Sequence, residues 1–376
     1  MFRIVTDTSA NLPTDYLLSE QITIIPYTFQ SGKGEQSCMD LATFDAKDFY
    51  TQMRSGVKVT TSQIPPQRYI DVLTPMLEAG EDVLFVSMSS GISGSYASGQ
   101  IAARQLREEF PDRKLLLVDT YSASLGEGLL VMRAVNCRRE GMCIDETYKT
   151  LRALRHRMAQ IFTVDDLRYL RRTGRLSNLE AAVGTVLQIK PLLKGDPQGK
   201  IVCFAKLRGR QRAVEAIAKR YEELVVDAQD QTVGIAHADC APDAQILASL
   251  LRRSSKPPKN ILMVDYEPVT GSHVGPGALA LFFLADENVR NIYICPQAPG
   301  SGVFRRRVFI RQHEAPDKHL SGAVSTLCGV CDRLQAAKQF LFSRDGVVRA
   351  DVLRLFAAPI HPDRLPAASS GSGDIL

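Results

Sequence analysis

Short β-branched segments alternate with helix-type patterns along most of the chain, and this alternation restricts the folds open to it. In the first part of the chain the strand patterns lie at 2–6, 22–27, 83–88 and 114–119. The helix patterns lie at 44–54, 68–78, 95–110 and 124–139. Alternation of this kind is typical of βαβ units, in which helices cover a mainly parallel sheet. The sequence therefore predicts an α/β fold whose first domain is doubly wound.

The second part of the chain continues the alternation after a helix pattern at 146–158. Strands are expected at 161–164, 189–193, 200–205, 233–236 and 261–264, and helices at 212–225 and 244–253. The apolar run 278–285 is expected to form a last helix that can pack on the first domain. Because 376 residues exceed the usual capacity of one core, we expect two α/β domains, 1–155 and 156–285.

Residues 286–376 differ in composition from the rest of the chain. We expect them to form a C-terminal extension of unknown structure, flexible in part. A Pro- and Gly-rich break at 296–302 precedes three arginines at 305–307, and the small residues at 367–373 are typical of a flexible tail. Cys328 and Cys331 form a lone C-x-x-C pair. Without a second pair at zinc-site spacing, their role stays open.

Charge and hydropathy bear on whether the chain is a nucleic-acid-binding, an exported or a membrane protein. The 46 basic and 41 acidic residues nearly balance, which argues against a nucleic-acid-binding protein. The N-terminus lacks the apolar stretch of a signal peptide. The longest apolar run, 278–285, is far shorter than the roughly 20 residues of a membrane span. We expect a cytoplasmic protein with reduced cysteines.

Two loops rich in hydroxyls stand between a strand pattern and a helix pattern. The first, 60–66, contains Thr61 and Ser62, follows a strand-like 57–59 and precedes a helix opened by Pro66. The second, 89–95, contains Ser93. Hydroxyls at a helix N-terminus either cap the helix or help to hold an anion. Two such loops can converge on one ligand.

Two further loops add basic donors. Arg208 and Arg210 flank Gly209 after a strand, and His273 precedes the glycines of a 273–277 turn and the expected apolar helix. Taken singly, each can be a charged turn or a helix cap. Together with the hydroxyl loops they form a set of donors, which suits a carboxylate or phosphate.

Apolar residues lie close in sequence to these donors, and core packing is their ordinary role. An acyl chain gains about 0.8 kcal/mol per buried methylene, so a long chain could gain on the order of 10 kcal/mol in a tunnel. A buried carboxylate would then need the donors. The apolar candidates are Leu187, Ile189, Leu192, Leu193, Phe204, Leu279, Phe282 and Phe283.

Enzyme motifs are incomplete, which favours a binding protein over an enzyme. The segment 195–200 resembles a P-loop but fails in length and in its final hydroxyl. His313 and Glu314 lack the second histidine of a zinc protease motif. The segment 91–95 resembles a nucleophile elbow, except that Ser95 stands where glycine is required.

The ordered motifs of residues 1–285 resemble the DegV family of bacterial fatty-acid-binding proteins, the acyl-carrying subunits of fatty acid kinase. This resemblance implies a two-domain DegV-like architecture with an acyl chain buried between or within the domains. Residues 286–376 have no counterpart in it. The motifs are D-T-S at 7–9, T-S-Q at 61–63, S-S-G-I-S-G-S-Y at 89–96, V-D-T at 118–120, S-L-G-E-G at 124–128, D-L-R-Y-L at 166–170, G-R-L-S at 174–177, K-P at 190–191 and H-V-G-P-G at 273–277.

The resemblance also implies roles for single residues. The carboxylate contacts would be Thr61, Ser62, Ser93 and His273, and Arg208 would support them. Arg175 would face the phosphoryl group or the kinase partner. No cofactor is expected, because the partner would supply ATP. Transient membrane contact would allow lipid exchange. Ile64 and Ser95 depart from the usual proline and threonine of the family, which affects loop stiffness and side-chain volume.

Two alternative functions stay open at this point. The first is a serine acyl hydrolase or acyltransferase that uses Ser93 with His273. The second is a regulatory module that acts through the basic extension 286–376. The sequence leaves open the length and unsaturation of the acyl chain and the oligomeric state.

Overall fold

The computed structural model describes residues 2–38, 43–177, 189–286 and 289–290. All of them belong to one compact unit, Met1–Arg311. The predictions for Leu187, for Cys328 and Cys331 and for most of the extension lie outside the described residues. The division into domains at residue 155 stays a prediction.

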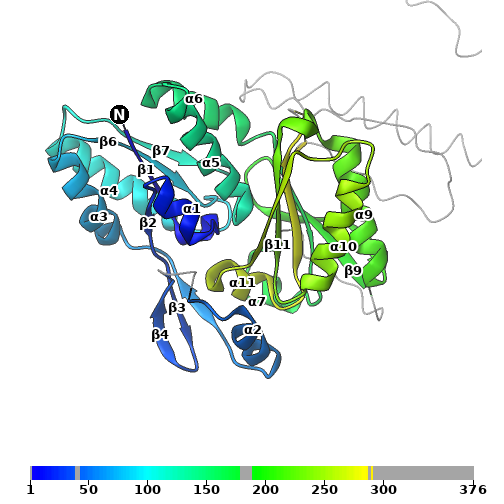
Figure 1. Ribbon diagram of the computed structural model, residues 1–376. Coiled ribbons are helices and arrows are strands. Elements are labelled where there is room, and N and C mark those ends of the chain that lie inside the picture. The colour runs from blue at the N-terminus through cyan, green and yellow to red at the C-terminus, as the bar shows by residue number, and fades with distance from the viewer. Residues whose placement is uncertain (1, 39–42, 178–188, 287–288, 291–376) are drawn as a thin grey trace, which may run out of the picture. The chain divides into compact units, whose positions relative to one another are not determined.

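The first sheet has four parallel strands in the order β2-β1-β6-β7. Helices α3 and α4 pack together on one face, and α5 and α6 pack together on the other (Figure 1). This arrangement confirms the doubly wound first part. The elements are β1 (Phe2–Asp7), β2 (Thr23–Ile25), β6 (Asp82–Ser87), β7 (Leu115–Asp119), α3 (Pro66–Glu78), α4 (Ser95–Glu109), α5 (Leu125–Arg139) and α6 (Ile144–Leu154).

A small antiparallel sheet that the sequence did not predict joins β4 (Gly34–Ser37), β3 (Thr28–Ser31) and β5 (Thr60–Ser62). The strand expected at 57–59 is therefore wrong, because the hydroxyl residues themselves form the strand. Thr60 and Thr61 pair with β3, and β-branched threonines suit a strand. Near this sheet in sequence are α1 (Thr14–Ser19) and α2 (Ala46–Arg54).

The second large sheet has six strands in the order β10-β9-β8-β13-β11-β12. Helices α9 (Arg210–Leu224) and α10 (Ala241–Arg252) pack on it. Two short helices, α7 (Arg168–Arg172) and α11 (Pro268–Val274), lie in its connections. The strands are β8 (Met158–Thr163), β9 (Ile189–Gly195), β10 (Ile201–Arg208), β11 (Thr232–His237), β12 (Asn260–Asp265) and β13 (Leu279–Leu284).

The helix expected at 278–285 is wrong, because this segment is β13, between β8 and β11. Its side chains are buried on both faces: Leu281 and Phe283 lie in one core cluster, and Ala280 and Phe282 lie in the other. A strand covered on both faces needs no polar alternation. A short apolar run therefore cannot be told from a buried helix by its periodicity.

Helix α5 packs against strands of both large sheets, β1 and β6 on one side and β8, β11 and β13 on the other. The contact is close, since a Cβ on Gly234 of β11 would lie 2.7 Å from Leu125 Cβ. A helix with neighbours on both sides is buried in most of its length. This packing joins the two sheets around the larger of the two core clusters. In the described part of the chain, no helix is both long and apolar enough to cross a bilayer.

Candidate functional site

A cavity of about 180 Å³ lies among segments far apart in the sequence: β5, the loop after β6, β8, α11 and β13. Part of its wall is polar, and part is apolar. The polar wall includes Thr61, Ser62, Gln63, Ser93, Arg175 and His273, and the apolar wall includes Met88, Ile92, Phe162, Leu170, Val269 and Phe282. Five of the six predicted site residues therefore line one cavity.

Thr61 and His273 form the central polar contact of this wall. Thr61 Oγ1 lies 2.8 Å from His273 Nε2. The capping interpretation of the first hydroxyl loop is wrong, because α3 begins after Pro65 with no side-chain cap. His273 also lies in the last turn of α11 and not before a helix. Glu267 caps α11 and accepts hydrogen bonds from the Val269 and Thr270 backbone.

The His273 imidazole is neutral at pH 7. Burial, together with the charges of Arg175 and Arg172, lowers its pKa from 6.5 to about 4. Its Nδ1 atom is buried and has no hydrogen-bond partner among the described residues. A neutral imidazole can donate one hydrogen bond to an anion but does not add a positive charge.

Ser93 belongs to a second group of hydroxyls in the same wall. Its Oγ lies 3.2 Å from Tyr27 OH, donates to Ser95 Oγ at 3.1 Å and accepts from Ser95 N at 3.2 Å. The sequence did not identify Tyr27 as a site residue, because a tyrosine that ends an apolar strand pattern resembles a core residue. Tyr27 is in fact buried with its hydroxyl at the cavity.

Arg175 supplies the positive charge of the cavity. Among the described lining residues it is the single Arg or Lys. Its Nε donates to Ile92 O at 3.2 Å, and its Nη1 donates to Thr173 O. These backbone contacts hold the guanidinium at the wall and leave further N–H groups for an anion.

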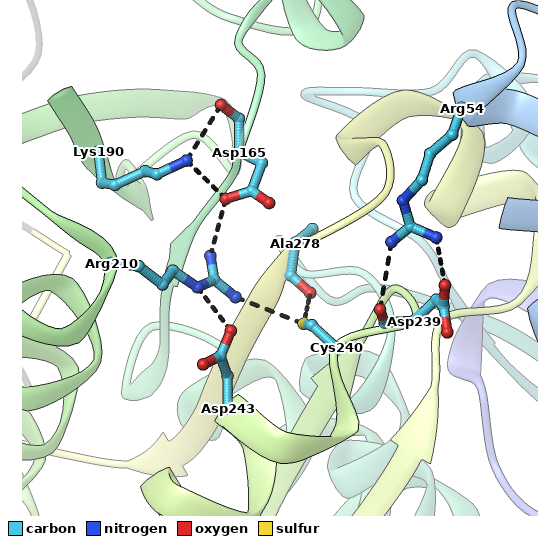
Figure 2. Close-up of polar contacts among 8 residues, drawn as sticks. All are labelled: Arg54, Asp165, Lys190, Arg210, Asp239, Cys240, Asp243 and Ala278. Atoms are coloured by element: carbon cyan, nitrogen blue, oxygen red, sulfur yellow. Dashed lines mark hydrogen bonds and ion pairs between the residues drawn. The ribbon is translucent and has the colours of Figure 1, made fainter. Parts of the chain in front are cut away.

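Arg208 does not line this cavity; it is exposed at the end of β10. Its neighbour Arg210 has a structural role, shown in Figure 2: it pairs with Asp243 at 2.8 Å and with Asp165 at 3.5 Å. Lys190 pairs with the same Asp165 at 2.7 Å. Asp165 packs on the turn after His273, since a Cβ on Gly277 would lie 2.1 Å from Asp165 Oδ2. The ionic cluster therefore supports the turn that follows the histidine.

The D-T-S and S-L-G-E-G motifs meet in the core, and of their residues Ser124 lines the cavity. Ser9 Oγ lies 2.5 Å from Asp7 Oδ1 and 2.5 Å from Glu127 Oε2. A hydroxyl has one proton to donate, so one of the two carboxyl groups carries a proton. Burial raises the pKa of Asp7 to about 6, and burial with the Asp7 charge raises that of Glu127 well above its usual value.

Ser93 and His273 do not have the geometry of a hydrolytic Ser–His pair. His273 contacts Thr61 and not Ser93, and in the described part of the chain no carboxylate holds His273 Nδ1. A general base of this kind needs an orienting partner. Over the same residues, no group of His, Cys, Asp and Glu is arranged to hold a metal ion. The cavity is suited to binding an amphipathic anion.

Comparison with known proteins gives a consistent result. The model of the family described as "Uncharacterised protein, DegV family" matches residues 1–286. A DegV domain-containing protein of Clostridium perfringens is 35% identical over 286 residues, which are 76% of this chain and 98% of that protein. A DegV family protein from Thermus thermophilus, whose solved structure concerns fatty acid binding, is similar with a TM-score of 0.69 and 27% identity, covering 76% of this chain and 99% of that one. DegV from Bacillus subtilis, a fatty acid binding protein, is similar with a TM-score of 0.65 and 26% identity, covering 76% and 99%.

Proposed function

The chain belongs to the DegV family, and we propose that it binds a long-chain fatty acid in the cavity. It then presents the carboxylate to a partner ATP-dependent kinase, which forms an acyl phosphate. The fatty acid binding of the Thermus thermophilus and Bacillus subtilis relatives supports the ligand class. The kinase step and a cytoplasmic location are parts of the proposal.

The observation that carries the proposal is that hydrogen-bond donors and apolar side chains line one cavity. A fatty acid likewise combines a polar head with an apolar chain. Its chain gains about 0.8 kcal/mol for each methylene that leaves water. Its carboxylate, once buried, needs hydrogen bonds and a compensating charge.

The head group would lie against Thr61, Ser62, Ser93 and His273, whose hydroxyl and imidazole N–H groups would turn from their present partners to donate to it. Arg175 would supply the charge, because it is the cation of the described wall. In the same position it could stabilise the phosphoryl group once the acyl phosphate forms. We assign Arg208 no direct contact with the ligand.

The chemistry would reside in the partner. Phosphoryl transfer depends on groups that hold the nucleotide and its magnesium ion. The sequence carries no P-loop motif, so the chain would act as the acyl carrier. Transient contact with a membrane would allow it to collect and deliver the acid.

The proposal is tested by titrating the delipidated protein with oleate and with oleyl alcohol, which share one chain. We expect oleate to bind more tightly, and Arg175→Gln to remove most of the difference. Equal binding of acid and alcohol by the unaltered protein would contradict the carboxylate assignment. Hydrolysis of a chromogenic ester by the protein alone, lost in Ser93→Ala, would instead support the serine hydrolase.

A further inference from the structure

A second, smaller cavity of about 30 Å³ adjoins the first, since Gln160 of β8 lines both. Gln160 is 8% exposed and is a polar residue in a core strand. Its Nε2 lies 3.5 Å from Tyr121 O, a long contact for a buried amide. The Gln160 side chain therefore lies between two spaces.

The register of β8 on β13 places Gln160 away from the polar wall. Thr163 pairs with Leu279, close to the turn after His273, whereas Gln160 pairs with Phe282 three residues further along β13. At about 3.4 Å per residue, this is roughly 10 Å along the sheet. Met158 lies further still and lines only the second cavity. A chain that extends inward from the head group along β8 would reach Gln160 and then the second cavity.

The second cavity is lined by residues of both β8 and β9, near the point where their pairing ends. The two strands pair only at Ile161 with Lys194 and Phe162 with Leu193. Beyond this point Gly195 presents bare backbone to the gap: a Cβ there would lie 2.1 Å from Gln160 Nε2 and 2.7 Å from Arg290 Nη1. The Gln160 amide and the Arg290 guanidinium thus fill the gap against Gly195.

Arg290 is held firmly, and it comes from beyond the segment that matches the family, which ends at residue 286. Its Nη1 donates to Tyr121 O at 2.8 Å, its Nη2 to Ser122 Oγ at 2.8 Å and its Nε to Arg155 O at 3.0 Å. It is 4% exposed. A side chain with so many donors engaged is a fixed wall and not a mobile one.

We propose that Gln160, held between Gly195 and Arg290, closes the inner end of the acyl cavity and sets the longest chain that binds well. The inference rests on the proposed function, because it takes the ligand to be a fatty acid. A longer chain must displace the Gln160 amide from its contact with Tyr121 and press its terminal methyl on polar groups. A chain that stops short of Gln160 avoids both costs.

The test compares the affinities of laurate, myristate, palmitate, stearate and arachidate for the delipidated full-length protein. For the unaltered protein we expect a gain of up to about fourfold per methylene up to a limiting length, and no gain beyond it. Gln160→Ala joins the two cavities, so the limit should move to a longer acid. Gln160→Met keeps the length of the side chain, and Met158→Ala enlarges only the second cavity; both should keep the original limit.

Gly195→Ala provides a test of opposite sign. The new methyl would push Gln160 towards the acyl cavity, so the limit should move to a shorter acid. Gly195→Ala also tests the role of Gln160 if circular dichroism shows that Gln160→Ala does not fold. An unchanged limit in folded Gln160→Ala and Gly195→Ala would overturn the role of Gln160. Failure of the unaltered protein to bind any of the acids would instead overturn the proposed function.

Discussion

Arg175 and Arg208 carry the same charge, but they lie in different surroundings. Arg175 lines the cavity with its Nε bound to Ile92 O, whereas Arg208 is exposed at a strand end. A hydrogen bond to a charged group contributes about 1.5–3 kcal/mol. We therefore expect Arg175→Gln to weaken oleate binding by roughly 10- to 100-fold.

Arg208→Gln is the matched control for this change and should alter the affinity less than about twofold, because an exposed charge is screened by solvent. Isothermal titration of both variants checks the prediction. A larger loss for Arg208→Gln than for Arg175→Gln would reverse the assignment.

The buried carboxyl groups of Asp7 and Glu127 should make stability depend on pH. Both pKa values are raised in the folded chain, so the folded state holds protons that the unfolded state releases above about pH 4–5. The free energy of unfolding then falls as the pH rises, by up to about 1.4 kcal/mol per pH unit for each retained proton. For Asp7 this fall in the free energy of unfolding ends near its folded pKa of about 6.

Glu127→Gln isolates this effect, because the amide resembles the protonated carboxyl group but does not titrate. Relative to the unaltered protein, it should gain stability as the pH is raised from about 5 to about 7. His273, with a lowered pKa, contributes in the opposite direction to both proteins and cancels in the difference. Urea unfolding at several pH values measures the difference in stability between Glu127→Gln and the unaltered protein. A pH-independent difference would show that Glu127 is ionised in the folded chain.

At the residue scale, the polar loops identified Thr61, Ser62, Ser93 and His273, and the family resemblance added Arg175; all five line one cavity in the structure. Polar residues in loops between regular elements can be found in this way. Tyr27 could not, because its hydroxyl reaches the cavity only through the tertiary fold. Arg208 was predicted as a site residue because it lies in a basic turn. It does not line the cavity, since the sequence does not reveal to which side the end of a strand points.

At the scale of elements, β13 shows where pattern reasoning fails. Its six residues are all apolar because both faces are buried, and such a run fits a strand or a helix. The hairpin of β3 and β4 was missed for the opposite reason: four-residue strands with few apolar side chains resemble loops. The longer helices α3, α4 and α5 were predicted to within a few residues, since their periodicity extends over several turns.

The turn between α11 and β13 yields a prediction at this scale. Gly277 has φ of +81°, and an added Cβ would meet Asp165 at 2.1 Å. Gly277→Ala should therefore destabilise the protein by more than about 1 kcal/mol and should also weaken ligand binding, because His273 precedes this turn. Chemical unfolding and oleate titration report the two effects.

Gly141→Ala is the control for backbone strain alone. Gly141 also has φ of +81°, but an added Cβ would meet nothing within 4 Å. It should cost about 1 kcal/mol and leave ligand affinity unchanged. If both variants lose affinity equally, the turn has no special link to the site.

At the scale of the molecule, Arg290 connects segments that are distant in sequence. It contacts the loop at Tyr121 and Ser122 and the end of α6 at Arg155. Removing it leaves these acceptors buried without their donor, at about 1–3 kcal/mol for each. Arg290→Ala should lower the free energy of unfolding by at least about 2 kcal/mol.

Arg253→Ala, at the exposed end of α10, is the matched control and should change stability by less than about 0.5 kcal/mol. Denaturant unfolding compares the two. Equal stability of Arg290→Ala and the unaltered protein would mean that the first described residues of the extension are not part of the fold. Composition gave no sign of this role, because a single arginine after a β-strand resembles a surface residue.

The central claim is that the cavity holds a fatty acid by its carboxylate. It is tested most directly by purifying the protein without added lipid, denaturing it and analysing the organic extract by mass spectrometry. We predict long-chain fatty acid in near-stoichiometric amount from the unaltered protein, and much less from Arg175→Gln. Folded protein that releases no fatty acid, or the same amount from both, would contradict the claim.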